Sequence, residues 1–400
     1  MKSFRQDLQQ QLLERKHNAL LRHRRTLLSP QGTEIILDGN HVTSFCSNDY
    51  LGLADHPDVI QAYHEGLENF GAGSGASHLV SGHMASHHAL ENELAEFTGR
   101  SRALIFSSGY MANVGVLTTL LGKNDAVFED RLNHASLLDG GLFSGAAFKR
   151  YPHLDMGTLD KQLTDSSGQK KLIVSDGVFS MDGDKALLPE LITISEKNDA
   201  ILMLDDAHGF GVLGKEGGGL TAQWQEQGVH IDEDNLQVLI GTFGKAFGAS
   251  GAFVVGSEEL IETLIQFCRP YIYTTAISPA MAVALRTSLK LIRKDNWRRQ
   301  YLTQLIQRFK DHCADLGLEV LASDSPVQAV ILGDAETALQ ASEELLNKGV
   351  YVTAIRPPTV PQESARLRIT FSAIHTESQF QKLLDSLEVV ARMSNLASMT

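Results

Sequence analysis

Short apolar runs alternate with helical segments between about residues 50 and 290, and this alternation constrains the fold more than any other feature. The strand-length runs are ALIF (103–106), AVFED (126–130), LIVSDGVF (172–179), ILMLDDAH (201–208), LQVLI (236–240) and AFVVG (252–256). Helical patterns separate most of them, which predicts βαβ units and a mostly parallel sheet covered on both faces. The last two runs are too close for an intervening helix, so they are either antiparallel neighbours or joined by an unusual loop.

The pattern changes toward both ends of the chain. After about residue 290, a long charged helix precedes short strands at VQAVIL (327–332) and RLRITFS (366–372), which predicts a smaller α+β domain. Near the N-terminus, apolar residues at helical spacing predict a helix over residues 3–24 that packs on the body of the protein. ILDGNHVTSF (36–45) predicts a hairpin with a Gly-Asn turn. We therefore expect an α/β protein with an N-terminal segment (1–49), a large domain (50–290) and a small C-terminal domain (291–400).

Composition excludes several classes of protein. The net charge of −13 argues against non-specific nucleic-acid binding, which needs a basic surface. The sequence contains no run of about 20 apolar residues, so we expect no membrane span. The charged N-terminus lacks the apolar core of a signal peptide. The cysteines Cys46, Cys268 and Cys313 are far apart and form no CxxC pair. This spacing suggests neither a disulfide framework nor a cysteine zinc site, and favours a reducing, cytoplasmic compartment.

Polar residues at strand ends are the candidates for chemistry, because ligands of open α/β sheets sit at the carboxyl ends of the strands. Asp205, Asp206 and His208 follow the run ILML, and His134 follows AVFED. Alone, each histidine is as readily explained as a hydrogen-bonded structural residue. The segment FSSGYMANVG (106–115) ends a strand and opens a helix, which is a natural anion site and equally a serine N-cap.

Two glycine-rich segments require separate interpretation. GFGVLG (209–214) formally matches a dinucleotide fingerprint, but the following KEGGGLTAQW is a poor helix start, so we do not expect nicotinamide binding. In GSGASHLVSGHMASHH (73–88), His83 and His87 are four residues apart, as on a metal-binding helix face. The stretch contains no acidic ligand and no HExxH motif. We expect no metal there, and a loop that approaches a ligand or a second subunit instead.

The decapeptide GTFGKAFGAS (241–250) places Lys245 among small residues just after an apolar strand. A poorly solvated lysine has a lowered pKa and is available as a neutral amine that can bond to an aldehyde. The small neighbours would leave room for a planar ring. The alternative is a lysine whose ammonium group reaches solvent.

The combination of these features is more specific than any one of them. A strand-end lysine, an acid about forty residues earlier at another strand end, and a Ser/Gly helix start together match the needs of pyridoxal phosphate. The lysine holds the aldehyde, the acid keeps the ring nitrogen protonated, and the helix start receives the phosphate.

The motifs DGVFSMDGD (176–184), LDDAHGFGVLG (204–214) and GTFGKAFGASGAF (241–253) resemble those of the α-oxoamine synthases. These are fold-type I pyridoxal-phosphate transferases of the aspartate aminotransferase superfamily. The resemblance extends from SNDYLGLADHP (47–57) to RPPTVP (356–361) and ARLRITFSA (365–373). It implies a large domain with a mostly parallel central sheet and a smaller C-terminal α+β domain.

The resemblance also implies roles for individual residues. Lys245 would bond to the cofactor, Asp205 would pair with the ring nitrogen, His208 would contact the ring oxygen, and His134 would stack on the ring and meet the substrate. The other implied cofactor contacts are Ser108, Gly109, Tyr110, Ser180, Thr242, Thr274 and Thr275, of which the last two would reach the cofactor of a second subunit in a homodimer. The implied substrate contacts are Arg22, Asn48, Arg356 and Thr359, with Arg356 on the amino-acid carboxylate and Arg24 and Arg25 as alternatives to Arg22.

DDAHG together with GTFGKAFGASGA resembles the branch that condenses L-alanine with a pimeloyl thioester, carried on coenzyme A or on acyl-carrier protein. Two alternatives remain open. One is a glycine-using acyltransferase of the same family, and the other is a non-catalytic regulator that binds pyridoxal phosphate.

Overall fold

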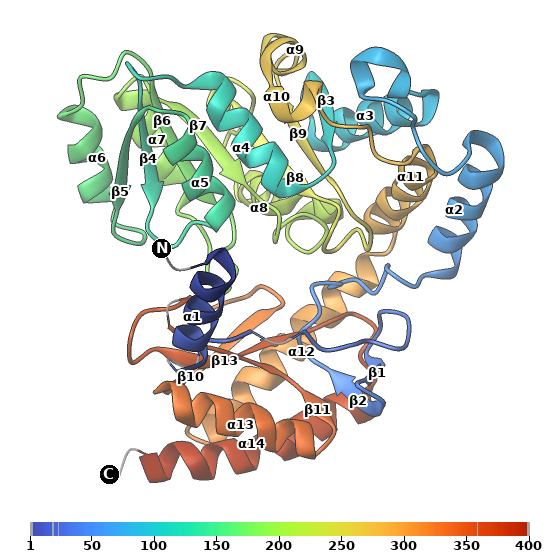
Figure 1. Cartoon of the computed structure of the whole chain (residues 1–400), viewed down its shortest axis with the longest axis vertical. Coiled ribbons are helices and arrows are strands. Elements are labelled where there is room, and N and C mark those ends of the chain that lie inside the picture. The colour runs from blue at the N-terminus through green and yellow to red at the C-terminus, as the bar shows by residue number, and fades with distance from the viewer. Residues whose placement is uncertain (1–2, 18–19, 23, 358, 398–400) are drawn as a thin grey trace.

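The computed structural model describes residues 3–17, 20–22, 24–357 and 359–397, with side chains described up to residue 393. The chain folds into a large upper part and a smaller lower part joined by long helices (Figure 1). Within the described residues, no helix combines the length and apolar character needed to cross a membrane.

A seven-stranded sheet forms the centre of the large part. Its strands, in spatial order, are β3 (Arg102–Phe106), β9 (Ala252–Gly256), β8 (Val238–Thr242), β7 (Ile201–Asp205), β6 (Lys171–Asp176), β4 (Ala126–Asp130) and β5 (Ala147–Tyr151). Strand β9 is antiparallel to both of its neighbours, and the other neighbouring pairs are parallel. The predicted sheet is therefore confirmed, with β8 and β9 as antiparallel neighbours. Strand β5 was not predicted, because its sequence AFKRY is half polar and lies at the sheet edge.

Helices cover both faces of this sheet because alternate strand residues point in opposite directions. Val127 packs in one apolar cluster with α4 (Gly109–Leu120), α5 (Ala135–Phe143) and α9 (Glu258–Phe267). Phe128 packs in the other cluster. That cluster also includes residues of α3 (Ala85–Thr98), α6 (Met156–Thr164), α7 (Leu188–Lys197), α8 (Gly219–Glu226), α11 (Pro279–Lys294) and α12 (Asn296–Asp315). The remaining helical segments are α2 (Pro57–Phe70), the π-helical turn η1 (His78–Gly82), the 3-10 turn η2 (Lys215–Gly217) and α10 (Arg269–Ile272).

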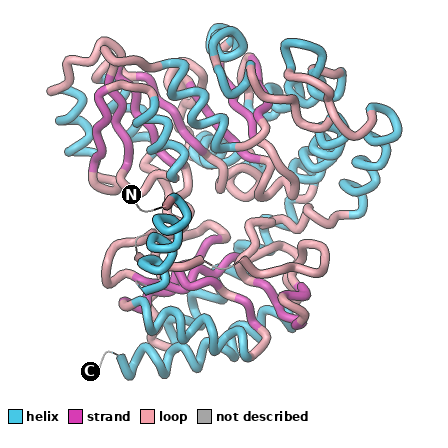
Figure 2. Tube along the Cα trace, viewed as in Figure 1, coloured by secondary structure: helices cyan, strands magenta, loops and turns pink. Residues whose placement is uncertain are grey.

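Two three-stranded sheets build the smaller part. Figure 2 shows strands of this part below the large sheet. One contains β10 (Val327–Gly333), β13 (Ala365–Thr370) and β12 (Thr353–Ile355), all antiparallel. The other contains β1 (Glu34–Leu37), β2 (Asn40–Ser44) and β11 (Val350–Tyr351). The N-terminal hairpin thus pairs with a strand from the far end of the chain. Helices α13 (Ala335–Asn347) and α14 (Glu377–Ala397) pack against each other below these sheets.

Two local predictions at the N-terminus need correction. The first helix, α1 (Phe4–His17), is shorter than predicted and buries none of its residues, so it does not pack on the body through its apolar side chains. Helical periodicity predicts a helix but does not identify what covers its apolar face. The hairpin forms, but its turn is Asp38–Gly39, because both residues adopt the positive φ that a two-residue turn requires.

Candidate active site

The carboxyl ends of β3, β4, β6, β7 and β8 meet at one edge of the sheet, and a cavity opens there. Parallel strands place their following loops at the same edge, so residues far apart in the sequence come together. Of the residues predicted to contact a cofactor, eight line this cavity: Gly109, Tyr110, His134, Ser180, Asp205, His208, Thr242 and Lys245.

Lys245 lies in the loop after β8, facing the carboxylates at the ends of β6 and β7. Burial lowers the pKa of Lys245 to about 8, although the charges of Asp205 and Asp176 oppose that effect. The prediction of a lysine with a lowered pKa is therefore confirmed. An amine with a pKa near neutrality can give up and take back a proton during catalysis.

Asp205 ends β7 and is held by two donors. Asn113 Nδ2 donates to Asp205 Oδ2 over 2.7 Å, and the Ala207 N–H donates to Oδ1 over 3.0 Å. The Asn113 side chain was not predicted as a partner of Asp205, because Asn113 lies inside α4 with no motif around it. The opposite carboxyl group, Asp176, pairs in register with Asp205. Burial, together with the adjacent Asp205 charge, raises the pKa of Asp176 well above its usual range.

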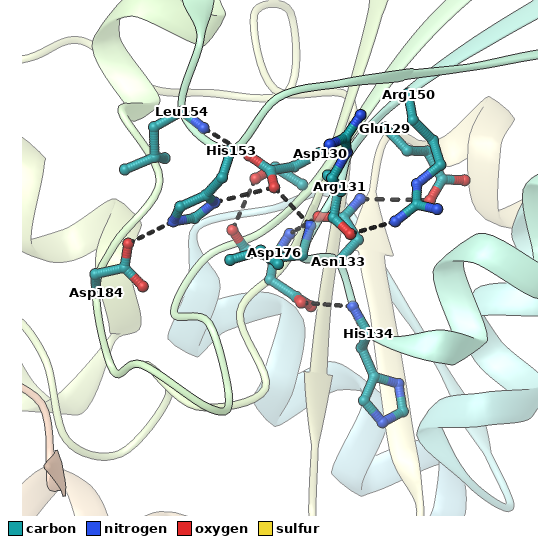
Figure 3. A network of polar contacts seen from close by, with 12 residues as sticks. Glu129, Asp130, Arg131, Asn133, His134, Arg150, His153, Leu154, Asp176 and Asp184 are labelled. Carbon is teal, nitrogen blue, oxygen red and sulfur yellow. Dashed lines mark hydrogen bonds and ion pairs between the residues drawn. The ribbon is translucent and has the colours of Figure 1, made fainter. Parts of the chain in front are cut away.

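His134 caps α5 and presents one ring nitrogen to the cavity. The Ser136 N–H donates to His134 Nδ1 over 3.3 Å, and Ser136 Oγ lies 2.7 Å from the same atom. Because Nδ1 accepts, the hydrogen of the neutral ring is on Nε2. Burial is the largest cause that lowers the pKa of His134, which favours this neutral form. The His134 backbone N–H donates to Asp176 Oδ2 over 2.7 Å, which ties the two strand ends together (Figure 3).

His208 is buried, and its Nδ1 lies 2.7 Å from the Tyr50 hydroxyl. Tyr50 also donates to Asn48 Oδ1 over 3.2 Å. Burial lowers the pKa of His208 well below its usual value, so the ring is neutral. Arg368, on β13 of the smaller part, donates from Nη2 to the same Asn48 oxygen and from Nε to the Ser180 carbonyl oxygen. The smaller part therefore supplies a buried guanidinium group that sequence reasoning missed.

The first turn of α4 provides backbone donors at the other end of the cavity. Ser108 Oγ accepts from the Met111 N–H, so the serine is the N-cap. The N–H groups of Gly109 and Tyr110 have no partner within the helix, as at any helix start. A Cβ at Gly109 would meet only Thr242 Oγ1, at 4.0 Å, and would extend toward the cavity. Thr274 and Thr275 do not line this cavity; Thr275 instead bridges to Ser77.

A second cavity adjoins the first through His134 and Ser180. Arg22 and Thr359, both predicted substrate contacts, line it together with apolar residues such as Leu132 and Val360. Asn48 lines a third cavity, which reaches Lys245 from another side and also contains Arg25. Arg356, the residue predicted to bind the amino-acid carboxylate, lines none of these three cavities.

The donor set of the first cavity fits pyridoxal phosphate. A lysine with a lowered pKa, a hydrogen-bonded strand-end carboxylate and a helix start with free N–H groups lie around one space. These are the groups that an aldehyde, a pyridinium nitrogen and a phosphate each require.

Comparisons with known proteins agree with this chemistry. A family model described as aminotransferase class I and II matches residues 40–387. The chain is 55% identical over 382 residues to the 8-amino-7-oxononanoate synthase of Cellvibrio japonicus, which covers 96% of this chain and 95% of that protein. It is 54% identical over 377 residues to the synthase of the same name from Nitrosococcus oceani, covering 94% and 99% of the two chains. The protein belongs to the 8-amino-7-oxononanoate synthase family.

Solved structures place this family member among fold-type I transferases. The 8-amino-7-oxononanoate synthase of Francisella tularensis superposes with a TM-score of 0.77 at 33% identity, covering 89% of this chain and 99% of that one. Serine palmitoyltransferase of Sphingomonas wittichii superposes with a TM-score of 0.90 at 30% identity, covering 99% and 98%. A variant of the S. paucimobilis enzyme, with a TM-score of 0.89 and 30% identity over 98% of each chain, holds bound PLP. The family and these relatives imply that PLP is used.

The small residues around Lys245 in GTFGKAFGAS (241–250) have more than one structural reason to be small. Gly248 adopts φ +71°, and a Cβ there would lie 2.4 Å from the Leu53 and Ala54 backbone. By contrast, a Cβ at Gly244 would have its nearest contact at 3.5 Å. The expectation that all of these small residues leave room for a ring is therefore wrong for Gly248. It is small because two chain segments touch there.

His153 bridges two loops that shape the site. Its Nδ1 lies 3.0 Å from Asp130 Oδ1, and its Nε2 lies 2.7 Å from Asp184 Oδ2 (Figure 3). Asp130 ends β4, four residues before His134, and Asp184 closes the loop that carries Ser180. Burial favours the neutral ring, but the hydrogen bonds that the ring donates to both carboxylates, together with their charges, outweigh burial and raise the pKa of His153 to about 10. The ring is thus a cation at neutral pH, and it holds both loops.

We expect His153→Gln to lower the free energy of unfolding at pH 6 by roughly 2–4 kcal/mol, because one partner of a half-buried ion pair is removed. The folded pKa of about 10 exceeds the unfolded value of about 6.5. The stabilisation is therefore complete below pH 6.5 and disappears as the pH rises toward 10. Urea denaturation of both proteins at pH 6 and at pH 9.5 measures this difference. A difference that stays constant between the two pH values would show that the His153 charge is not involved.

Proposed function

We propose that this protein condenses L-alanine with a pimeloyl thioester, carried on coenzyme A or acyl-carrier protein. The products are 8-amino-7-oxononanoate, carbon dioxide and the free thiol, a step of biotin synthesis. The observation that carries this proposal is Lys245, whose lowered pKa and position in one cavity with Asp205 and His134 suit proton transfer at an amino-acid Cα. High identity to synthases of that name over nearly the whole chain supports it.

We propose pyridoxal 5'-phosphate as the cofactor. When bound, it supplies an aldehyde that bonds to an amine and a conjugated ring that takes up an electron pair. Lys245 would hold the aldehyde, Asp205 the ring nitrogen, His208 the ring oxygen and His134 the ring face. The phosphate would be held by Ser108, Gly109, Tyr110 and Thr242, with Ser180 beside the ring.

The residues of this chain would act in a fixed order. Lys245, as a free amine, would remove the Cα proton of alanine. Cα would then bond to the thioester carbonyl carbon as the C–S bond breaks, with His134 Nε2–H donating a hydrogen bond to the carbonyl oxygen. The sulfur would leave as a thiolate and take a proton from solvent to become the free thiol. Loss of the alanine carboxylate as carbon dioxide follows, and Lys245 returns a proton to Cα. Asp205 would accept a hydrogen bond from the ring nitrogen of the bound cofactor, held in place by Asn113 and the Ala207 N–H.

We propose Arg368, rather than Arg356, as the partner of the alanine carboxylate. Neither Arg356 nor Arg368 lines the three cavities, so the preference for Arg368 rests on its contacts. Arg368 is buried, donates to Asn48 and to the Ser180 carbonyl oxygen, and its charge reaches Lys245 and His208. A planar guanidinium group suits a carboxylate because it donates two parallel hydrogen bonds.

We expect Arg368→Gln to raise the KM for alanine by about 10–100-fold, the effect of losing a charge-assisted pair. The KM for the acyl thioester should change little, which distinguishes this role from a general loss of folding. Arg356→Gln is the matched control, with an expected effect on the alanine KM below about threefold. Steady-state kinetics with each substrate varied in turn measures both. A larger effect from Arg356→Gln would restore the assignment made from the sequence.

We propose that the acyl thioester occupies the cavity that Arg22 and Thr359 share with His134. Arg22 is favoured over its neighbours because Arg25 lines the third cavity and pairs with Asp38, while Arg24 lines none of the three. We also propose a homodimer in which Thr274 and Thr275 reach the cofactor of the second copy, since neither lines the cavity of its own chain.

Product identification by mass spectrometry tests the function. The purified protein is supplied with alanine or glycine and with pimeloyl, acetyl or octanoyl thioesters. Formation of 8-amino-7-oxononanoate from alanine and the pimeloyl thioester is the expected result. A preference for glycine would indicate the 2-amino-3-ketobutyrate ligase branch. Bound cofactor without release of carbon dioxide from any pair would indicate a regulator.

A further inference from the structure

The histidine-rich segment before α3 gathers several metal-ligating side chains away from the catalytic cavity. His78 begins the π-helical turn η1, His83 follows that turn, and His87 and His88 lie in the first turns of α3. Glu91 lies one turn further along the same helix. Two groups of three among these five residues have ligand atoms within 4.8 Å of one another.

His87 is occupied by structural hydrogen bonds. The Met84 N–H donates to His87 Nδ1 over 3.0 Å, so the ring hydrogen is on Nε2, which lies 2.9 Å from the Ile277 carbonyl oxygen. Both nitrogens are thereby used: one accepts and the other donates. The pair His83 and His87, which the sequence spacing brings to attention, is therefore not the metal-binding pair.

His83, His88 and Glu91 remain as the second group. His88 and Glu91 are three residues apart on α3 and so share one face of the helix. His83 Nε2 lies 3.8 Å from Glu91 Oε2. This distance is too long for a hydrogen bond. It is close to the ~3.4 Å that separates two ligands of a tetrahedral ion with bonds of about 2.0–2.1 Å.

Contacts behind Glu91 and His83 leave one ligand atom of each of these two residues facing the other. The Ile105 N–H donates to Glu91 Oε1 over 3.2 Å, which leaves Oε2 turned toward His83. His83 Nδ1 lies 3.0 Å from His78 Nδ1, so one of these two nitrogens carries the shared hydrogen. With that hydrogen on His83, its Nε2 offers a lone pair toward Glu91. His78 is itself held by stacking on Tyr271, with ring centroids 5.0 Å apart. Such a hydrogen-bond partner commonly orients a metal-binding histidine.

We propose that His83 Nε2, His88 and Glu91 Oε2 bind a divalent transition-metal ion of the zinc class, with a fourth position open to water. The chemistry of two imidazoles and one carboxylate suits zinc. The ion would fasten the 74–83 loop to α3. That loop also contacts residues 275–277, because Ser77 bridges to Thr275 and Ser74 donates to the Ile277 carbonyl oxygen. The site does not depend on the proposed reaction.

Zinc binding to the tag-free holoenzyme tests this proposal. Calorimetric titration with Zn²⁺ should show one site per chain with a Kd below about 10 µM. His88→Ala and Glu91→Gln should each weaken binding by at least about tenfold, and His78→Gln should do so through loss of orientation. His230→Ala, at a histidine that is 83% exposed outside the cluster, is the matched control and should bind as the wild type does. Circular dichroism without metal checks that each variant is folded.

Three results would overturn the proposal. The first is no binding by the wild type at 100 µM Zn²⁺. The second is unchanged zinc affinity in both His88→Ala and Glu91→Gln. The third is a loss of zinc affinity in His230→Ala as large as the loss in those two variants. Thermal melts give a second readout, because an ion that joins the loop to α3 raises the wild-type Tm and leaves that of His88→Ala unchanged.

Discussion

Lys245→Ala should fold normally, lose the visible absorbance of a covalently bound cofactor and lower kcat/KM by at least about 10³-fold. The physical reason is that, in the proposed mechanism, one amine provides both the covalent link and the proton transfer at Cα. Its pKa of about 8 suits the second task, since a group titrating near the working pH can both take and return a proton. The rate of product formation from alanine and the pimeloyl thioester gives kcat/KM, and an absorbance spectrum shows whether the cofactor is covalently bound.

Lys123→Ala is the matched control for this substitution, because Lys123 is exposed in the loop before β4. That variant should keep wild-type kinetics and absorbance. Turnover by Lys245→Ala within tenfold of the wild type would contradict the proposed mechanism, provided that circular dichroism shows the same folded content.

Asp205→Asn should lower kcat by about 10²–10⁴-fold while the cofactor stays bound. The amide has the shape of the carboxylate but no charge, so it cannot hold a proton on the ring nitrogen. The structure orients the Asp205 carboxyl group through hydrogen bonds from Asn113 Nδ2 and the Ala207 N–H. Steady-state kinetics and the stoichiometry of bound cofactor separate loss of chemistry from loss of binding.

Asp206→Asn is the matched control for Asp205→Asn, because Asp206 is the adjacent residue, undergoes the same substitution and is fully buried. Burial raises the pKa of Asp206 to about 8, so its side chain is largely neutral at pH 7 and resembles an amide. Its Oδ2 accepts from the Leu220 N–H, which the asparagine oxygen can also do. We expect less than about a fivefold change in kcat. Equal losses in the two variants would mean that the region needs two aspartates for folding rather than one charge for chemistry.

Local sequence signals predicted the strand-end residues of the site well. Apolar runs identified β4, β7 and β8, and the polar residues that end them include His134, Asp205 and Lys245. This succeeds because parallel strands bring their carboxyl ends to one edge, whatever helices connect them. Residues within elements escaped the same reasoning. Asn113 sits mid-helix and Arg368 mid-strand, and nothing in their local patterns distinguishes them from packing or surface residues.

The sequence by itself determined the class of fold and the chemistry of the site, because hydrophobic periodicity and strand-end polarity are properties of short segments. Only the tertiary structure decided which further residues lie beside those that the sequence singled out. It places Arg368 within hydrogen-bond distance of Asn48 and Asn113 within hydrogen-bond distance of Asp205. It also pairs His87 with the Ile277 carbonyl oxygen, while His83 faces Glu91. The physical reason is that such contacts join distant segments, so they depend on how helices and strands pack rather than on any local pattern.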